Sequence, residues 1–319
     1  MLQTMPHARQ SGSVLRIGVG VMPGPDALDA VLAAAATARA DLDGATPHLA
    51  VVVTTGVPRM DLTRAVRGVL GPVGVTGGIT AGLLTDQGFL TDGALVLCVS
   101  NSEGATSGVA ATTGRRLSDA AQAAARLVLA GWPFRGRYPR GIALSFTAHA
   151  SGAPAAGFLT PWRELMGPKM RTVCGMMSGP AVFGSASTPP LASVGCLEAS
   201  YLMGLGLAEG ADGADAEVII HGSVEATRTA LKWLEGHPAR VVLALESAAR
   251  HRALGAAAER EWAAIREQVR EHGPGGGPCI GWLCDEVAAC GRGVHPVDAP
   301  GALVMTALGD PPREHDRLT

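Results

Sequence analysis

The same order of apolar runs and helical segments recurs three times along the chain, and this recurrence constrains the fold more than any other feature. Residues 239–309 show it most clearly, with apolar runs at 241–245, 279–284 and 303–308 and a long helical segment at 253–271. Short apolar runs that alternate with helices are typical of sheets whose faces are both covered. The sequence therefore predicts an α/β fold of repeated β-α-β-α-β-β units, with mixed sheets covered by helices.

The predicted units cover about residues 14–99, 107–208 and 216–309. We group the first two into one part, 14–213, and assign the third to a second part, 214–310. Residues 1–13 are predicted to be a disordered N-terminal tail and 311–319 a second tail. We expect the last strand of the second unit to lie within 197–207. The third unit should open with a strand at 218–222, followed by a helix at 224–234. The alternative is that the alternation of strands and helices arises by chance.

Composition argues against several classes of protein. The formal net charge is −2, which does not suit a protein that binds nucleic acid by neutralising phosphates. The sequence contains no run of about 18–20 uncharged apolar residues that would predict a membrane span, and residues 1–13 lack the apolar segment of a secretory signal. The six cysteines are then best interpreted as reduced thiols. We expect a cytoplasmic protein that binds neither nucleic acid nor membrane.

A glycine-containing segment ends the third predicted strand of each unit, at residues 74–78, 175–179 and 281–286. Ligands in open α/β sheets bind beyond the carboxyl ends of strands, and glycines there allow close approach. The alternative is a tight turn with no ligand. None of the segments is a dinucleotide fingerprint or a phosphate loop. The ligand-binding residues predicted from these segments are Gly77, Gly78, Gly175, Met176, Trp282, Asp285 and Glu286.

The pair Asp285-Glu286 follows the third of these strands. Either carboxylate can accept hydrogen bonds from a ligand, or act as a base if its pKa is raised; the alternative is a solvated loop pair. A hydrolase would need a nucleophile, and Cys174 with His149 is the candidate pair, because no G-x-S-x-G motif is present. The cysteine spacings match no zinc site, so buried thiols are the simpler interpretation.

Three histidines follow or flank predicted strands. Neutral imidazole is a common haem ligand, so His149, His221 and His295 are candidate axial ligands, although a structural role is the commoner one for any single histidine. Haem is accordingly a possible cofactor.

The residues together resemble a known family. Residues 16–20, 47–53, 74–79 and 92–98 resemble the N-terminal part of FIST sensory domains. The third unit is similar to the C-terminal FIST part, with Arg250, then Glu261 on a helix, then Ile280-Gly281-Trp282 leading to Asp285-Glu286. The resemblance implies an intracellular domain that senses a small ligand, which in some members is haem. Two departures leave the ligand open: Asp285 stands where glycine is common, and residues 209–245 look shortened.

We therefore expect a cytosolic sensory domain that binds haem or a small metabolite and acts in signal transduction through a separate partner protein. The alternative is an enzyme on the same scaffold that uses Asp285, Glu286 or Cys174 as acid, base or nucleophile. A third possibility is a structural partner protein that binds no ligand.

Overall fold

The structure is a computed structural model. It describes residues 14–57, 61–103, 105–113, 116–131, 140–148, 154–167, 169–178, 190–199, 201–209, 214–272, 276–291, 294–298 and 301–311. Both predicted tails, apart from Pro311, lie outside the described residues.

The first unit runs from β1 to β6. Its elements are β1 (Leu15–Pro23), α1 (Ala27–Asp41), β2 (Leu49–Thr54), α2 (Leu62–Leu70), β3 (Gly74–Ile79), β4 (Leu83–Thr85), β5 (Gly88–Leu90) and β6 (Gly93–Asn101). Four of the strands form a sheet in the order β1-β6-β2-β3. In this sheet β2 and β3 are parallel, and β6 is antiparallel to both of its neighbours.

The second and third units repeat this topology. The second contains β7 (Ala105–Thr112), α3 (Leu117–Gly131), β8 (Arg140–Ala148), α4 (Ala156–Met166), β9 (Met170–Met177) and β10 (Ala192–Ala199). The third contains β11 (Leu202–Ala208), α5 (Ala216–Lys232), β12 (Ala239–Ser247), α6 (Ala248–Leu254), the 3₁₀ turn η1 (Gly255–Ala257), α7 (Ala258–His272), β13 (Cys279–Cys284), β14 (Glu286–Gly291), β15 (Val294–Asp298) and β16 (Leu303–Gly309). Their sheets contain the orders β7-β10-β8-β9 and β11-β16-β12-β13, with the same parallel and antiparallel pairings as the first. The predicted α/β fold of repeated units with mixed sheets is confirmed.

Two units extend the sheet of another unit. The hairpin β4–β5 leaves the first unit and pairs with β13, so that Leu83 lies opposite Trp282. The hairpin β14–β15 leaves the third unit and pairs with β9, with Glu286 opposite Met176. Each addition makes a six-stranded sheet. Main-chain hydrogen bonds therefore join the units in addition to side-chain packing.

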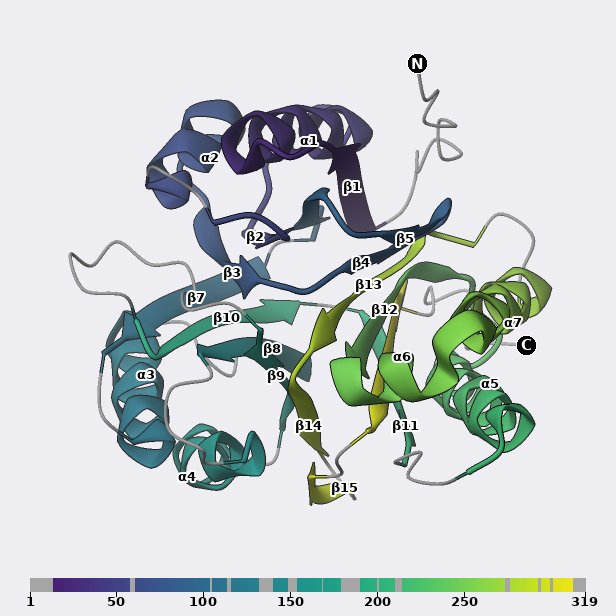
Figure 1. The fold of residues 1–319 in the computed structure, drawn as a ribbon. Coiled ribbons are helices and arrows are strands. Elements are labelled where there is room, and N and C mark those ends of the chain that lie inside the picture. The colour runs from purple at the N-terminus through teal and green to yellow at the C-terminus, as the bar shows by residue number, and fades with distance from the viewer. Residues whose placement is uncertain are drawn as a thin grey trace, which may run out of the picture.

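The three sheets face one central core, and helices cover their outer faces (Figure 1). On β2 the side chains of Leu49, Val51 and Val53 belong to this central core, whereas Ala50 and Val52 pack with α1 and α2. Because both faces are buried, the strand is apolar throughout and does not alternate with polar residues.

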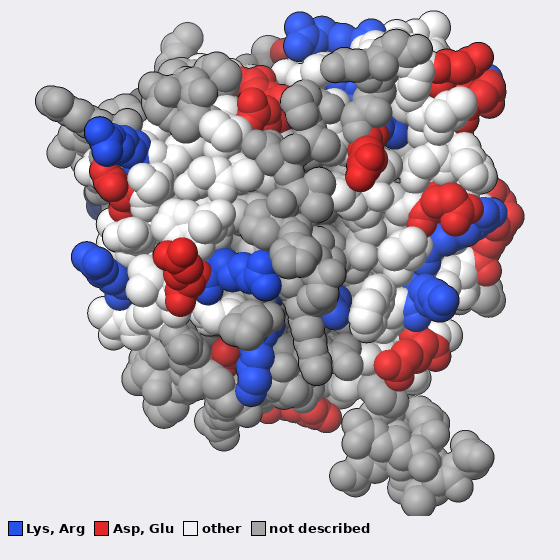
Figure 2. All heavy atoms as spheres, turned by 90° about the horizontal axis from the view of Figure 1, so that it is seen from below, with Lys and Arg blue, Asp and Glu red and all other residues white. Residues whose placement is uncertain are grey.

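Acidic and basic side chains are interspersed on the face shown in Figure 2, so the described residues there form no large field of one sign. Within the described part of the chain, no helix is both long and apolar enough to cross a membrane.

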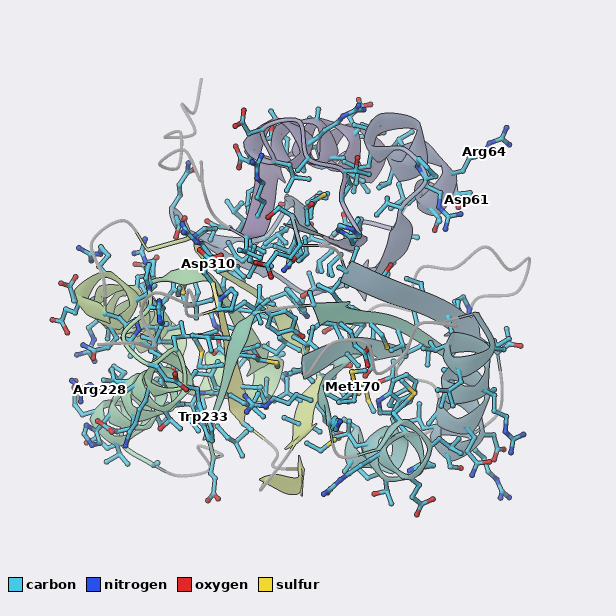
Figure 3. The ribbon with its side chains drawn as sticks, turned by 180° about the vertical axis from the view of Figure 1, so that it is seen from behind. Asp61, Arg64, Met170, Arg228, Trp233 and Asp310 are labelled. Atoms are coloured by element: carbon cyan, nitrogen blue, oxygen red, sulfur yellow. The ribbon has the colours of Figure 1, made fainter. Side chains whose placement is uncertain are left out.

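Asp310, just after β16, joins the third unit to the first. One carboxylate oxygen accepts the N–H of Leu15 at 2.9 Å, and the other accepts from Nε and Nη2 of Arg240 at 2.8 and 2.6 Å. Asp310 is labelled in Figure 3. The two ends of the described chain are thus held side by side.

One element predicted near the start of the third unit is wrong. Residues 218–222, expected to be a strand, lie within α5, whose N-cap Asp215 accepts the N–H of Glu217. Val218 is 64% exposed, while the buried positions of α5 recur every three or four residues, as a helix requires. The segment 197–207 instead contains the end of β10 and most of β11, so the third unit begins at Leu202.

Two Gly-x-Gly pairs allow the first helix of a unit to lie directly on its first strand. A Cβ added at Gly20 would lie 1.8 Å from the carbonyl oxygen of Ala34, and one added at Gly206 would lie 1.8 Å from that of Ala226. The alanines on the facing helix complete this close contact. The pair Gly18-Val19-Gly20, which is not a nucleotide-binding motif, thus has a packing role that Gly204-Leu205-Gly206 repeats.

Gly206→Ala should destabilise the protein by about 1–3 kcal/mol or more, because the new methyl group overlaps main-chain atoms that cannot move independently. Gly68→Ala is the matched control: Gly68 lies in α2 with nothing within 4 Å of an added Cβ. It should be neutral or stabilise by up to about 1 kcal/mol, because alanine favours the helix. Urea unfolding of the two variants checks this, and equal midpoints would contradict the packing role.

Candidate functional site

A cavity of about 650 Å³ lies where the β4–β5 hairpin of the first unit meets α6 and α7 of the third. Its wall contains two aromatic residues, three ionisable residues and several small ones. The aromatic residues are Phe89 and Trp262, and the ionisable residues are His251, Glu259 and Arg266. The small residues are Gly88, Gly255, Ala256, Ala258 and Ala263, and Leu84 and Gln87 complete the wall. The volume falls within the roughly 300–1,000 Å³ of small-molecule sites.

Hydrogen bonds fix the hairpin against α7. The turn between β4 and β5 is closed by Thr85, whose hydroxyl accepts the N–H of Gln87 and donates to the carbonyl of Gly88. The indole N–H of Trp262 donates to the carbonyl of Thr85 at 2.7 Å, and Arg266 donates to the carbonyl of Asp86. Since Trp262 and Arg266 lie one turn apart on α7, this helix and the hairpin form a fixed pair of cavity walls.

His251 lies in the wall with a buried carboxylate behind it. Its Nδ1 is 3.3 Å from Oε1 of Glu246, a residue near the end of β12 that is 3% exposed. The ring of His251 also packs on Phe89, with 4.6 Å between ring centroids. The pair is close enough to be an ion pair, although its N–H is not aligned for a well-formed hydrogen bond.

The contact with Glu246 raises the pKa of His251 above its ordinary value. Burial acts in the opposite direction, and the negative charges of Glu246 and Glu261 add to the increase.

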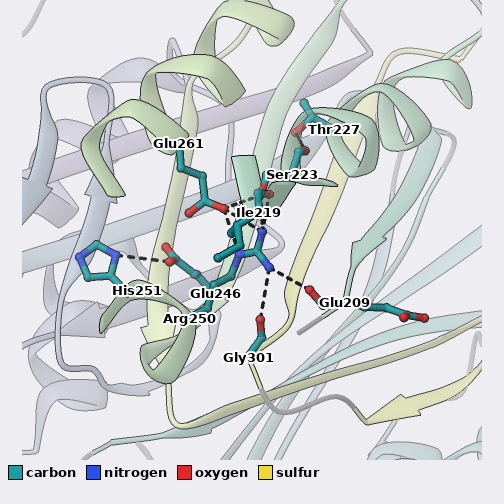
Figure 4. Close-up of polar contacts among 9 residues, drawn as sticks. All are labelled: Glu209, Ile219, Ser223, Thr227, Glu246, Arg250, His251, Glu261 and Gly301. Carbon is teal, nitrogen blue, oxygen red and sulfur yellow. Dashed lines mark hydrogen bonds and ion pairs between the residues drawn. The ribbon is translucent and has the colours of Figure 1, made fainter. Parts of the chain in front are cut away.

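Arg250, the residue before His251, is the centre of a buried polar network (Figure 4). All five of its N–H donors find acceptors. These are Oε1 of Glu261 (3.0 Å), the carbonyls of Glu209 (2.9 Å), Gly301 (3.3 Å) and Ile219 (2.9 Å), and the hydroxyl of Ser223 (2.6 Å). Ser223 in turn donates to Glu261. The network joins α5, α6 and α7 to the segments that flank β11 and β16.

Two carboxylates and one guanidinium are buried together here. Arg250 neutralises Glu261, with 2.9 Å between Nη2 and Oε1, which leaves Glu246 to be balanced. A protonated His251 makes the set neutral, and this is the physical reason for its raised pKa. Burial, with the charge of Glu246 next, raises the pKa of Glu261 despite the opposing effect of Arg250.

The glycine-containing segments predicted to bind a ligand lie in the sheets and do not line this cavity. Gly77 and Gly78 are buried in β3, and at Gly77 (φ +141°) an added Cβ would lie 1.7 Å from the carbonyl oxygen of Val52. Gly175 is buried in β9, where an added Cβ would lie 2.5 Å from Sγ of Cys284. In both places glycine permits close packing of protein against protein.

Met176 and Trp282 are also buried, and Trp282 stacks on Phe146 with 5.7 Å between centroids. Hydrogen bonds join the ends of β3, β9 and β13, the strands that carry Gly77, Met176 and Trp282. Thr80, just after β3, donates to the carbonyl of Leu283 on β13, and the N–H of Asp285 donates to the carbonyl of Met176 on β9.

Asp285 lies between β13 and β14, and Glu286 is the first residue of β14. Oε2 of Glu286 accepts the N–H of Ala155 at 2.9 Å, so this carboxylate lies at the start of α4, where the helix dipole favours negative charge. The carbonyl of Asp285 faces the hydroxyl of Ser247 at 3.4 Å. The contacts of this pair thus connect elements of the fold.

Cys174 is fully buried in β9, so it is not accessible to a substrate in this structure. Its proposed partner His149 lies outside the described residues.

The candidate haem ligands gain no support from the residues that the structure describes. His221 lies on α5 with its side chain exposed to solvent, rather than at a strand end. His149 is outside the described residues, and of His295 the structure describes only the backbone in β15. Among the described side chains, no three His, Cys, Asp or Glu residues come together as a metal site would require. Of the three candidates, only His221 has a described side chain, and it does not lie where the sequence predicted.

Sequence reasoning missed Glu246, His251, Trp262 and Arg266. Arg250 and Glu261 were singled out only through the family resemblance. A glutamate near the end of an otherwise apolar strand was the available signal at Glu246, because a buried carboxylate needs a partner. Nothing in the sequence showed that the turn of a hairpin in the first unit would meet α7, since 177 residues separate Thr85 from Trp262.

No protein-family model and no curated protein matches this chain. Among solved structures it is similar to a cyanuric acid hydrolase from A. caulinodans, with a TM-score of 0.47 and 13% identity over 93% of this chain and 99% of that one. It is also similar to T. maritima PurL complexed with ADP, with a TM-score of 0.30 and 11% identity over 92% of this chain and 71% of that one. At these values neither likeness bears on function.

Arg250→Met should destabilise the protein by about 3–5 kcal/mol, because it leaves the carboxylate of Glu261 and several acceptors buried without their partner. The double variant Arg250→Met, Glu261→Met should recover part of this loss, since neither buried charge remains. Arg228→Met is the control: Arg228 forms an exposed ion pair with Glu225, and its loss should cost less than about 1 kcal/mol. Urea unfolding measures all three, and a double variant less stable than Arg250→Met would contradict the interpretation.

Stability should also depend on pH through His251. Because its pKa is raised on folding, the charged imidazole contributes stability that is fully present below the unfolded pKa of about 6.5 and is lost as pH rises through the folded pKa. The difference in unfolding free energy between wild type and His251→Gln should therefore shrink over that range. Glu246→Gln should remove the same pH dependence. A difference that stays constant with pH would contradict the charge balance described above.

Proposed function

We propose that this protein is a cytoplasmic sensory domain that binds a small organic metabolite in the cavity between the β4–β5 hairpin and α7. The observation that carries the proposal is the cavity wall itself, in which two aromatic side chains and a few ionisable groups surround about 650 Å³. Binding sites for small molecules commonly combine a mostly apolar wall with a few polar groups that orient the ligand.

The position of the cavity suits a sensor. One wall is the hairpin of the first unit, the other belongs to the third unit, and they are joined at Thr85–Trp262 and Asp86–Arg266. A ligand that contacts both walls would bind more tightly when the walls are associated than when they are apart. This difference in binding free energy between two arrangements is what a signal requires. The output would pass to a separate partner protein, as the FIST resemblance implies. Haem stays a prediction from the sequence: of its three candidate ligands only His221 has a described side chain, and His221 does not line this cavity.

The second candidate function is an enzyme in which His251 is the general base. The observation that favours it is the carboxylate of Glu246, 3.3 Å from Nδ1, because a carboxylate that orients a histidine is common in catalytic sites. His251 would then take the role that the sequence had suggested for Asp285, Glu286 or Cys174.

Filling the cavity tests the proposed function. Ala263→Phe places a large side chain on the exposed cavity face of α7, and Ala253→Phe is the matched control on an exposed position of α6 outside the cavity. A panel of small metabolites should contain compounds that raise the melting temperature of wild type and of Ala253→Phe but not of Ala263→Phe. Ligand at a hundredfold excess over Kd stabilises by about 2.7 kcal/mol, which is readily detected.

Compounds that stabilise both phenylalanine variants equally would show that they bind elsewhere and would overturn the assignment of the cavity. Turnover of a stabilising compound, lost in His251→Gln while its binding remains, would select the enzyme over the sensor.

A further inference from the structure

The polar groups of the cavity indicate the charge of its ligand. We propose that the cavity binds an organic anion, a small planar carboxylate held by Arg266 and His251. This inference rests on the proposed function and adds to it the chemical class of the ligand.

Arg266 is the first argument. Its side chain lines the cavity, and one of its N–H groups donates to the carbonyl of Asp86. Its Nε is buried and has no hydrogen-bond partner in the described part of the protein. Because Nε has no accessible surface, a ligand in the cavity would meet the terminal Nη groups of Arg266. Guanidinium groups bind carboxylates with charge-assisted and often bidentate hydrogen bonds.

His251 provides the second argument. Its Nδ1 faces Glu246, which leaves Nε2 as the ring nitrogen that is not directed at that carboxylate (Figure 4). In the protonated form both nitrogens are donors. The cavity wall therefore contains a second cationic donor whose charge Glu246 maintains.

The other charged groups around the cavity have to be weighed against these two. Glu261 lies behind the wall and is paired with Arg250. Glu259 lines the cavity but is exposed, so solvent and salt screen its charge. Asp86 lies beside the wall, and one of its carboxylate oxygens accepts the main-chain N–H of Cys279 at 3.2 Å. The N-terminus of α7 at Ala258 also forms part of the wall, and its dipole adds to the preference for an anion.

The aromatic residues suggest the shape of the ligand. Phe89 and Trp262 both line the cavity, and Phe89 packs against the ring of His251 in a tilted arrangement. Flat rings pack well against such side chains. An organic cation placed between these rings is the competing possibility, but it would lie against Arg266 and a protonated His251. The arrangement favours a planar carboxylate.

Three probes with the same ring and different charge test the inference: benzoate, benzamide and benzylammonium. Isothermal titration calorimetry below pH 6.5 should show benzoate binding about tenfold more tightly than benzamide, the typical effect of a charge-assisted hydrogen bond, and benzylammonium binding least. Arg266→Gln should weaken benzoate about tenfold and leave benzamide unchanged, which also shows that the cavity remains intact. Arg266→Lys should recover part of the benzoate affinity.

Arg260→Gln is the matched control, because Arg260 lies on the same helix but is exposed and pairs with Glu217. It should leave all three affinities unchanged. Benzoate affinity should also fall as pH rises through the pKa of His251, and this fall should be absent in His251→Gln.

Failure of benzoate to bind, or benzoate binding that Arg266→Gln leaves unchanged, overturns the inference. The sensor proposal then still stands if benzamide or benzylammonium binds wild type and not Ala263→Phe. Tighter binding of benzylammonium would identify a cation site instead. If no probe and no metabolite distinguishes Ala263→Phe from Ala253→Phe, the proposed function fails as well.

Discussion

The buried guanidinium of Arg250 positions the elements around which the candidate site is built. It donates to a carbonyl and a hydroxyl of α5, to the carboxylate of Glu261 on α7, and to carbonyls next to β11 and β16. Buried charged groups of this kind are weak contributors to net stability, because desolvation offsets the attraction. Their contribution here is geometric: α7 has one position in which all of these bonds form, and that position creates the cavity wall.

Addition of a hairpin from one unit to the sheet of another explains why the cavity lies between units. Each sheet has four strands of its own unit, and pairing of β4 with β13 brings the turn 85–88 of the first unit beside α7 of the third. Since the hairpin is held by main-chain hydrogen bonds on one side and by Trp262 and Arg266 on the other, the cavity has two rigid walls of different origin.

Local patterns in the sequence predicted much of the architecture. Apolar runs such as residues 49–53 were recognisable as strands covered on both faces, and the order of strands and helices indicated the repeat. The errors came where one short segment is compatible with two structures. Residues 218–222 have strand-like composition, yet they extend a helix because Asp215 caps it and Ile219 faces the core. Short apolar runs carry too little periodicity to separate these cases.

What the sequence determined by itself was therefore the fold class and the alternation of elements, because each depends on residues near one another in the chain. The tertiary structure alone decided the site. Glu246 and His251 are five residues apart, but the cavity also needs Phe89, and its opposite wall needs Trp262 and Arg266. These residues meet only when the hairpin of one unit pairs with the sheet of another. That pairing depends on long-range main-chain hydrogen bonds, which no local pattern of side chains specifies.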